Sequence, residues 1–439
     1  MKLPPVDEKY FDREYETMAR PQIDALQEEL LLEMVPYAYE HSPLTRATWD
    51  AAGVHPRDIR SLDDFRERAP FVDKDTLRHF RDERRDPFGG LCTLATSELT
   101  AVMSTSGTTG DPTLVPEKWG GGGGGRPTII TRDFWGMGVR PGDYLALVLF
   151  TFRGPTYGLF QGLGTIPLLF DFDPAEMARF CELSLRYRPT GLYNFGTVLI
   201  NAVRDACEQH GLDPVDVFSS YKGVVFAGEP LSPRARALAE SWDVELYEHC
   251  GVGDVTAAFE CEHHDGLHFW EDSAFVEGLD PDGDAPVADG ERCELVATSL
   301  VNRTAPLVRY RSDDIVRITR ETCRCGRTHA RMWPIGRKGD EVVVDGRAIL
   351  PIDIWHAVET VDACAMGLFQ VIRTTRDTDE LRLRVGFAPA WEDRQGTVRD
   401  EVQAAVRAAT GIVPVVELVP NAALLRLGPP HKIPRVAAR

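Results

Sequence analysis

A run of hydroxyl side chains and glycines at residues 105–110 is the part of the sequence best suited to bind an anion. Glycine lets backbone N–H groups approach a polyphosphate closely, and serine and threonine hydroxyls donate hydrogen bonds to its oxygens. It is not a Walker A loop, which needs Gly-Lys-Ser/Thr after its spacer, because Asp111 follows the last glycine. We expect this segment to be a polyphosphate-binding loop, and a plain polar turn is the alternative. The residues of the expected loop are Thr105, Ser106, Gly107, Thr108, Thr109 and Gly110.

Three cysteines and a histidine have the residue types of a zinc site. Cys323 and Cys325 form a C-x-C pair, and Cys261 and His268 form an earlier cluster. Three thiolates and one imidazole suit a closed tetrahedral structural site, which leaves no open position for catalysis. C-x-C is tighter than the usual zinc-knuckle spacing, so reduced buried thiols are the alternative. Other histidines compete for the same place, namely His263, His264 and His329.

The composition limits the class of protein. A chain of 439 residues is longer than one ordinary core, so two or more domains are expected. The net charge of -19 argues against a nucleic-acid partner, because most of the surface would repel a phosphate backbone. No run approaches the roughly 20 apolar residues that cross a bilayer, and the first residues lack the apolar core of a signal peptide. We therefore expect a cytoplasmic enzyme with reduced thiols and no membrane partner.

The hydrophobic pattern indicates which elements must position these groups. Apolar residues recur at intervals of three and four in residues 20–35, so the first hundred residues are expected to be helical. Helical segments then alternate with short apolar runs, which predicts an α/β fold with a largely parallel sheet. A β-rich stretch and a small C-terminal lid domain with strands and a helix should follow. The apolar runs are residues 144–150, 191–193, 223–226 and 244–247.

Several motifs occur in one order along the chain. They are Ser-Gly-Thr-Thr-Gly-x-Pro-Thr at 106–113, Phe-Ala-Gly-Glu-Pro at 226–230, Leu-Val-Arg-Tyr-Arg-Ser-Asp-Asp at 307–314 and Gly-Arg-Lys-Gly-Asp at 336–340. This order resembles the adenylate-forming superfamily of acyl-CoA synthetases, and within it the phenylacetate-CoA ligase family. Further marks of that family are Tyr-Phe-Asp from residue 10, Ser-Pro-Leu at 42–44, and the segments 70–78, 260–272 and 322–329.

The resemblance implies a fold and a domain division. A large N-terminal adenylation domain, residues 1–336, would hold parallel sheets, a helical start at 1–98 and a β-rich, zinc-containing part at about 261–330. A small α+β lid, residues 337–439, would turn on a hinge at 336–340. The implied cofactors are ATP and Mg2+, with structural Zn2+ and with coenzyme A as co-substrate.

The resemblance also implies roles for individual residues. The loop at 105–110 would hold the β- and γ-phosphates, and Gly228, Glu229 and Pro230 would line the adenine. Asp314 would accept both ribose hydroxyls, although a solvated turn aspartate is the plain alternative. Arg337 would reach the ribose and phosphates, and a surface salt bridge is its alternative.

Lys432 matches the C-terminal lysine that bridges the carboxylate and the α-phosphate during adenylation. A disordered tail lysine is the alternative at this position. Lys432 and Asp254 are the candidate catalytic residues.

Two parts of the predicted nucleotide site depart from the family pattern. Where the family has Tyr-Gly-Leu-Thr-Glu, this chain keeps Gly251 but has Cys250, Gly253 and Asp254 in place of tyrosine, threonine and glutamate. Asp254 retains a carboxylate that suits Mg2+. Asp111 stands where the family usually has lysine. These changes leave open a slow enzyme, an altered substrate, or a non-catalytic nucleotide-binding homologue.

The substrate is the least determined feature. Aromatic walls suit a flat ring, although core packing explains most such aromatics, and Asn194 is a candidate partner for an amino or hydroxy substituent. We expect a small aromatic carboxylic acid, with transfer to coenzyme A or, alternatively, to a hydroxyl or amine of a second aromatic molecule in specialised-metabolite biosynthesis. The sequence leaves open whether the protein forms a homodimer. The predicted pocket consists of Tyr157, Phe160, Tyr193, Asn194, Phe195 and Ala227.

Overall fold

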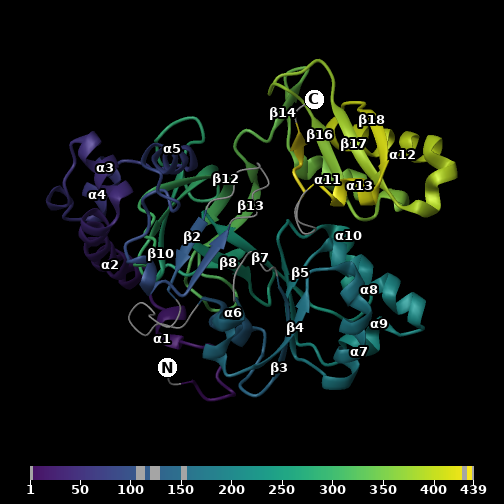
Figure 1. Ribbon diagram of the computed structural model, residues 1–439, viewed down its shortest axis with the longest axis horizontal. Coiled ribbons are helices and arrows are strands. Elements are labelled where there is room, and N and C mark those ends of the chain that lie inside the picture. The colour runs from purple at the N-terminus through teal and green to yellow at the C-terminus, as the bar shows by residue number, and fades with distance from the viewer. Residues whose placement is uncertain (1–2, 105–113, 119–128, 150–155, 428–432, 438–439) are drawn as a thin grey trace.

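A mixed sheet organises the larger part of the protein (Figure 1). The computed structural model describes residues 3–104, 114–118, 129–149, 156–427 and 433–437. Within these residues eleven strands join in the order β10-β11-β12-β13-β9-β8-β7-β6-β5-β3-β4. The α/β fold expected from the sequence is confirmed, and the parallel and β-rich parts share this one sheet.

The strands from β7 to β4 run parallel and carry helices on both faces. Helices α7 to α10 cover one face through a core that includes Phe180, Leu192 and Phe226. Helix α6 covers the other face with Phe134 and Trp135. The elements are β3 (Tyr144–Leu149), β4 (Ile166–Asp171), β5 (Gly191–Phe195), β6 (Gly223–Ala227), β7 (Leu246–Val252), α6 (Ile129–Gly136), α7 (Met177–Tyr187), α8 (Thr197–His210), α9 (Pro214–Phe218), α10 (Pro233–Glu240) and the 3-10 helices η5 (Thr156–Leu163) and η6 (Pro174–Glu176).

The remaining strands of the large sheet are antiparallel to their neighbours. Alternate apolar side chains, among them Val276, Leu295 and Val316, form a separate core there. The strands are β8 (Thr256–Glu260), β9 (Leu267–Phe269), β10 (Ala274–Leu279), β11 (Arg292–Ser299), β12 (Tyr310–Thr319) and β13 (Arg331–Arg337).

Helices from the N-terminal hundred residues pack against this antiparallel part (Figure 1). Helix α2 continues through Pro36 to His41, beyond the segment expected from periodicity, because Pro36 removes only one backbone donor from a long, well-packed helix. The elements are α1 (Arg13–Glu16), α2 (Arg20–His41), α3 (Pro43–Ala52), α4 (Leu62–Arg68), α5 (Lys74–Arg84), η1 (Pro56–Asp58), η2 (Thr96–Glu98) and the paired strands β1 (Ala101–Ser104) and β2 (Leu114–Glu117).

The first residues are fixed to a loop near residue 325. The Tyr10 hydroxyl donates to the carbonyl of Cys325 over 2.8 Å. Glu16 and Arg327, which are both almost completely buried, form an ion pair over 2.9 Å. A buried pair of this kind is costly to break, because the remaining charge would stay unpaired.

The C-terminal part has its own core, which includes Trp355, Phe369 and Val402. It stands over the carboxyl ends of the parallel strands, beside α10 (Figure 1), and Arg234 of α10 bonds to Asp362 over 3.0 Å. Its four-stranded sheet has the order β18-β17-β16-β19. The elements are β14 (Val342–Val344), β15 (Arg347–Ile349), α11 (Pro351–Glu359), η7 (Asp362–Cys364), β16 (Phe369–Ile372), β17 (Arg382–Phe387), η8 (Pro389–Arg394), α12 (Gln395–Thr410), β18 (Val415–Pro420), α13 (Asn421–Leu425) and β19 (Val436–Ala437).

None of the described helices has both the length and the apolar character needed to cross a membrane.

Candidate active site

A cavity of about 640 Å³ lies where the parallel strands end and the C-terminal part begins. Ligands of open α/β sheets bind outside the carboxyl ends of the strands, which is the position of this cavity. Strands β3, β5, β6 and β7 each contribute residues near their carboxyl ends to it. Predicted site residues that line the cavity are Tyr193, Asn194, Ala227, Gly228, Glu229, Pro230, Gly251, Asp254, Asp314 and Arg337.

Glu229 has a fixed environment on the turn after β6. One carboxylate oxygen accepts the backbone N–H of Thr197 over 3.2 Å, and the other accepts from Arg435 over 3.3 Å. Burial raises the pKa of Glu229, while the two contacts and the charge of Arg435 oppose that shift.

Asp314 and Arg337 meet at the opposite wall on neighbouring strands of the antiparallel part. The guanidinium Nε of Arg337 lies 3.1 Å from a carboxylate oxygen of Asp314. Asp314 also donates its backbone N–H to the hydroxyl of Ser312 over 3.1 Å. This places a carboxylate and a cation side by side at one end of the cavity.

Asp254 lies on the hairpin turn between β7 and β8. Both Gly253 and Asp254 have positive φ, at 53° and 55°, which explains why glycine suits the first position. A Cβ added to Gly253 would approach that of Ser312 at 3.0 Å, so a threonine there would need the backbone to change. The carboxylate of Asp254 is exposed at the cavity, where an oxygen ligand for a hard cation is available.

The predicted aromatic pocket is only partly assembled. Tyr193 lines the cavity, while Phe160 is buried behind it with the two rings 5.2 Å apart. Phe195 instead packs against Phe180 in the core on the other face of the sheet, so the structure does not bring it to the pocket.

The reason is an irregularity at Asn194, where the pairing of β5 with β6 shifts. The extra residue reverses the alternation of side chains, and asparagine accommodates its φ of 73° better than most residues. The Asn194 side chain donates to the carbonyl of Val148 over 2.9 Å.

Some predicted residues fall outside the part of the chain that the structure describes. These are the loop residues Thr105, Ser106, Gly107, Thr108, Thr109 and Gly110, together with Asp111 and Lys432. Tyr157 lies on η5, but its side chain is not among those described. The residues that follow Lys432, from Ile433 to Val436, line the cavity.

The cavity also contains residues that the sequence did not indicate. Burial lowers the pKa of Lys74, at the start of α5. Burial also lowers the pKa of His249, in this case to about 4. Burial and the charge of Glu260 raise the pKa of Glu248 to about 7. Trp355 and Arg435 enter from the C-terminal part. Lys74 could have been found from the sequence, because the segment 70–78 is one of the family's motifs. The presence of the other residues at the cavity depends on the tertiary structure and has no local sequence signal.

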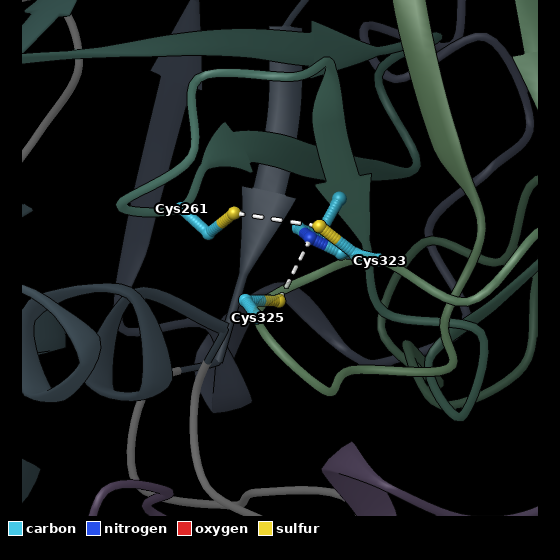
Figure 2. A group of neighbouring side chains, drawn as sticks. Cys261, Cys323 and Cys325 are labelled. Carbon is cyan, nitrogen blue, oxygen red and sulfur yellow. Dashed lines mark hydrogen bonds between the residues drawn. The ribbon is translucent and has the colours of Figure 1, made fainter.

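The four predicted metal ligands lie together, away from this cavity. The ligand atoms of Cys261, His268, Cys323 and Cys325 are all within 4.8 Å of one another, and all four residues are buried. Figure 2 shows the three sulfur atoms turned toward a common centre. The sulfur atoms of Cys261 and Cys323 are 3.7 Å apart, and that of Cys325 is 3.5 Å from His268 Nε2.

The comparisons with known proteins agree with the site geometry. No protein-family model matches the sequence. The chain is 30% identical over 411 residues to the phenylacetate-coenzyme A ligase of Thermus thermophilus, which covers 89% of this chain and 88% of that relative. A crystal structure of 2-hydroxyisobutyryl-CoA ligase in the postadenylation state, in complex with R3-HIB-AMP, matches with a TM-score of 0.85 and 27% identity over 100% of this chain and 94% of that one.

The same ligase in the thioesterification state, in complex with 2-HIB-AMP and CoA, matches with a TM-score of 0.70 and 28% identity over the same shares of the two chains, 100% and 94%. Because both structures are of one protein, the difference in TM-score reflects a different arrangement of its parts. The present structure is more similar to the postadenylation structure than to the thioesterification structure, with TM-scores of 0.85 and 0.70.

The fold and the cavity define an AMP-forming acid–CoA ligase of the adenylate-forming type. The chain belongs to the phenylacetate-CoA ligase family.

Proposed function

We propose that the protein adenylates a small aromatic carboxylic acid with ATP and then transfers the acyl group to coenzyme A. The observation that carries the proposal is the cavity, which joins the family's adenine, ribose and hinge motifs to an aromatic wall. These motifs come from separate segments, so their convergence supports one common site.

In the first half-reaction a carboxylate oxygen attacks the α-phosphorus of ATP and pyrophosphate leaves. Gly228 to Pro230 would line the adenine and Asp314 would accept the ribose hydroxyls. By resemblance, the loop at 105–110 and Lys432 would contact the phosphates and the carboxylate. Asp254 would hold Mg2+, which neutralises phosphate charge when bound.

In the second half-reaction the thiol sulfur of coenzyme A attacks the carbonyl carbon of the acyl adenylate and loses its proton. The bond from that carbon to the bridging oxygen breaks, and AMP leaves with this oxygen. We propose that residues 337–439 turn about residues 336–340 between the two steps. The different TM-scores of the two states of 2-hydroxyisobutyryl-CoA ligase, 0.85 and 0.70, support such a rearrangement in a related fold.

The aromatic nature of the acid rests on Tyr193. Its ring lines the cavity and is held from behind by Phe160 and Phe134, whose rings lie 5.2 Å and 6.2 Å away. A rigid ring at the cavity wall offers a flat apolar contact to another ring at little entropic cost. The curated relative from Thermus thermophilus is a phenylacetate ligase, which supports the same class of acid.

A structural zinc ion is the second part of the proposal. With Zn–S near 2.3 Å and Zn–N near 2.0 Å, tetrahedral geometry places sulfur atoms about 3.8 Å apart and sulfur and nitrogen about 3.5 Å apart. The observed separations of 3.7 Å and 3.5 Å fit these values. His268 Nδ1 faces the carbonyl of His329 at 3.3 Å, which favours the tautomer that leaves Nε2 for the metal.

Pyrophosphate release with a panel of aromatic and short aliphatic acids tests the function. The proposal predicts release with at least one aromatic acid, followed by a thioester when coenzyme A is added. Pyrophosphate release without a thioester, but with an ester or amide product from an added alcohol or amine, would identify that alcohol or amine as the acyl acceptor in place of coenzyme A. Tight ATP binding without release from any acid would indicate a non-catalytic homologue.

A further inference from the structure

His249 is a polar side chain in the otherwise apolar, aromatic side of the cavity. It lies near the end of β7, opposite Ala227 of β6, and lines the cavity. Its imidazole meets the ring of Tyr193 edge to face, with centroids 5.9 Å apart. Two residues earlier on the same strand, Tyr247 enters the core that also contains Phe160. Because alternate residues of a strand share a face, His249 belongs to the Tyr193 side of the cavity.

No side-chain hydrogen bond or ion pair of His249 is present in the described part of the chain. Burial holds its pKa near 4, so the imidazole is neutral at physiological pH. A neutral imidazole has one N–H donor and one acceptor nitrogen. His249 is half-buried at the cavity, so a ligand that displaces water from its imidazole must supply a hydrogen-bonding partner or lose those hydrogen bonds.

The nucleotide is not the best source of that partner. The residues assigned to adenine and ribose, Glu229 and Asp314, already bond to the cations Arg435 and Arg337. On the Tyr193 side, the Asn194 amide already donates one hydrogen bond to the carbonyl of Val148. The substrate acid is the ligand expected next to Tyr193.

We propose that His249 hydrogen-bonds a hydroxyl or amino substituent on the carboxylic acid, so that the substrate is a substituted acid and not a plain hydrocarbon acid. A hydroxyl both donates and accepts, which matches the two nitrogens of a neutral imidazole. This inference rests on the proposed function, because it assumes that the acid occupies the Tyr193 side.

Matched pairs of acids test the inference. Pyrophosphate release is measured for phenylacetic acid against its hydroxy isomers, benzoic acid against aminobenzoic and hydroxybenzoic acids, and isobutyric against 2-hydroxyisobutyric acid. At least one substituted acid should exceed its parent in kcat/KM by about 10- to 100-fold, as expected when a site built for a hydrogen bond meets an analogue without it. A higher kcat/KM for every unsubstituted parent would overturn the inference.

Variants then assign the preference to His249. In His249→Leu the ratio within the preferred pair should fall to about one, while His249→Gln, which keeps a donor and an acceptor, should retain part of it. His210→Leu, at the exposed end of α8, is the matched control and should leave the ratio unchanged. An unchanged ratio in a folded His249→Leu protein would assign the imidazole a structural role only.

The two proposals fail in different ways. If no acid releases pyrophosphate, the proposed function fails, and calorimetric binding of the same pairs still compares each substituted acid with its parent. Equal affinities within every pair would then overturn the role of His249.

Discussion

Arg435 of the C-terminal part and Glu229 of the large domain form an ion pair across the cavity, with 3.3 Å between Nη2 and Oε2. The Arg435 guanidinium lies 3.7 Å from the ring of Trp355 and donates to the carbonyl of Gly367 over 2.7 Å. Three residues before Arg435 is Lys432, the proposed catalytic lysine. The pair thus connects the segment that carries this lysine to the turn that is proposed to line the adenine.

We expect Arg435→Met to slow adenylation by about 10- to 100-fold, the equivalent of one lost charge-assisted hydrogen bond. Transfer from a supplied acyl adenylate should change little, because the C-terminal part is proposed to leave this position for the second step. Single-turnover measurements of each half-reaction provide the comparison. Arg384→Met, an exposed pair partner of Glu417 on the same domain, is the control. Equal slowing of both steps would show that Arg435 only stabilises the fold.

Lys432→Ala should abolish adenylate formation and leave thioester formation from a supplied acyl adenylate largely intact. The charge of the lysine is needed where the carboxylate and α-phosphate meet, and not after pyrophosphate has left. Lys222→Ala, on the exposed surface near Asp143, serves as the control. Normal adenylation by the Lys432 variant would refute its catalytic role.

The purified protein should contain about one equivalent of zinc, as one closed four-ligand site requires. Cys323→Ser should lose the metal and lower the melting temperature, because the Cys325 loop also holds Tyr10. Elemental analysis and thermal unfolding with and without a chelator measure both effects. Cys92→Ser removes a half-buried thiol outside the cluster and should retain the zinc. Metal-free protein of unchanged stability would identify the four residues as plain thiols and imidazole.

Glu248→Gln should reduce the pH dependence of stability. The pKa of Glu248 rises from an ordinary 4.5 to about 7 through burial and the neighbouring charge of Glu260. Between these values the native state holds a proton that the unfolded chain has released, so the free energy of unfolding falls as pH rises.

The glutamine variant stays neutral and should gain on the order of 1 kcal/mol relative to the parent at pH 8, but not at pH 4. Urea unfolding at both pH values measures the gain, and exposed Glu240→Gln is the control. The same gain at both pH values would contradict an elevated pKa.

Asp111→Lys should tighten ATP binding, because it restores a cation where the family has one. A charge-assisted contact with phosphate is worth on the order of 1.5 to 3 kcal/mol, or about 10- to 100-fold in affinity. Calorimetry of ATP binding compares the variant with the parent, and Asp216→Lys on the exposed surface of α9 controls for net charge. Unchanged affinity would mean that this side chain points away from the polyphosphate.

The sequence predicted the order of elements and the motifs that converge at the cavity, because hydrophobic periodicity and turn residues are local signals. It did not predict the extra residue at Asn194, which turns Phe195 into the core, since a shift in strand pairing has no single-strand signature. Arg435 and His249 were missed for another reason. Their significance depends on which distant segments they meet.

The attachment of the first residues to the loop at residue 325 sets a limit on how the chain folds during synthesis. Glu16 and Arg327 are separated by 311 positions, and ribosomes add about 5–20 residues per second. The N-terminal segment therefore waits about 15–60 seconds before its partner emerges. During that interval Tyr10, whose hydroxyl later donates to the carbonyl of Cys325, is without that partner. We therefore expect folding in the cell to depend on protection of the N-terminal segment from aggregation until the loop near residue 325 has been synthesised.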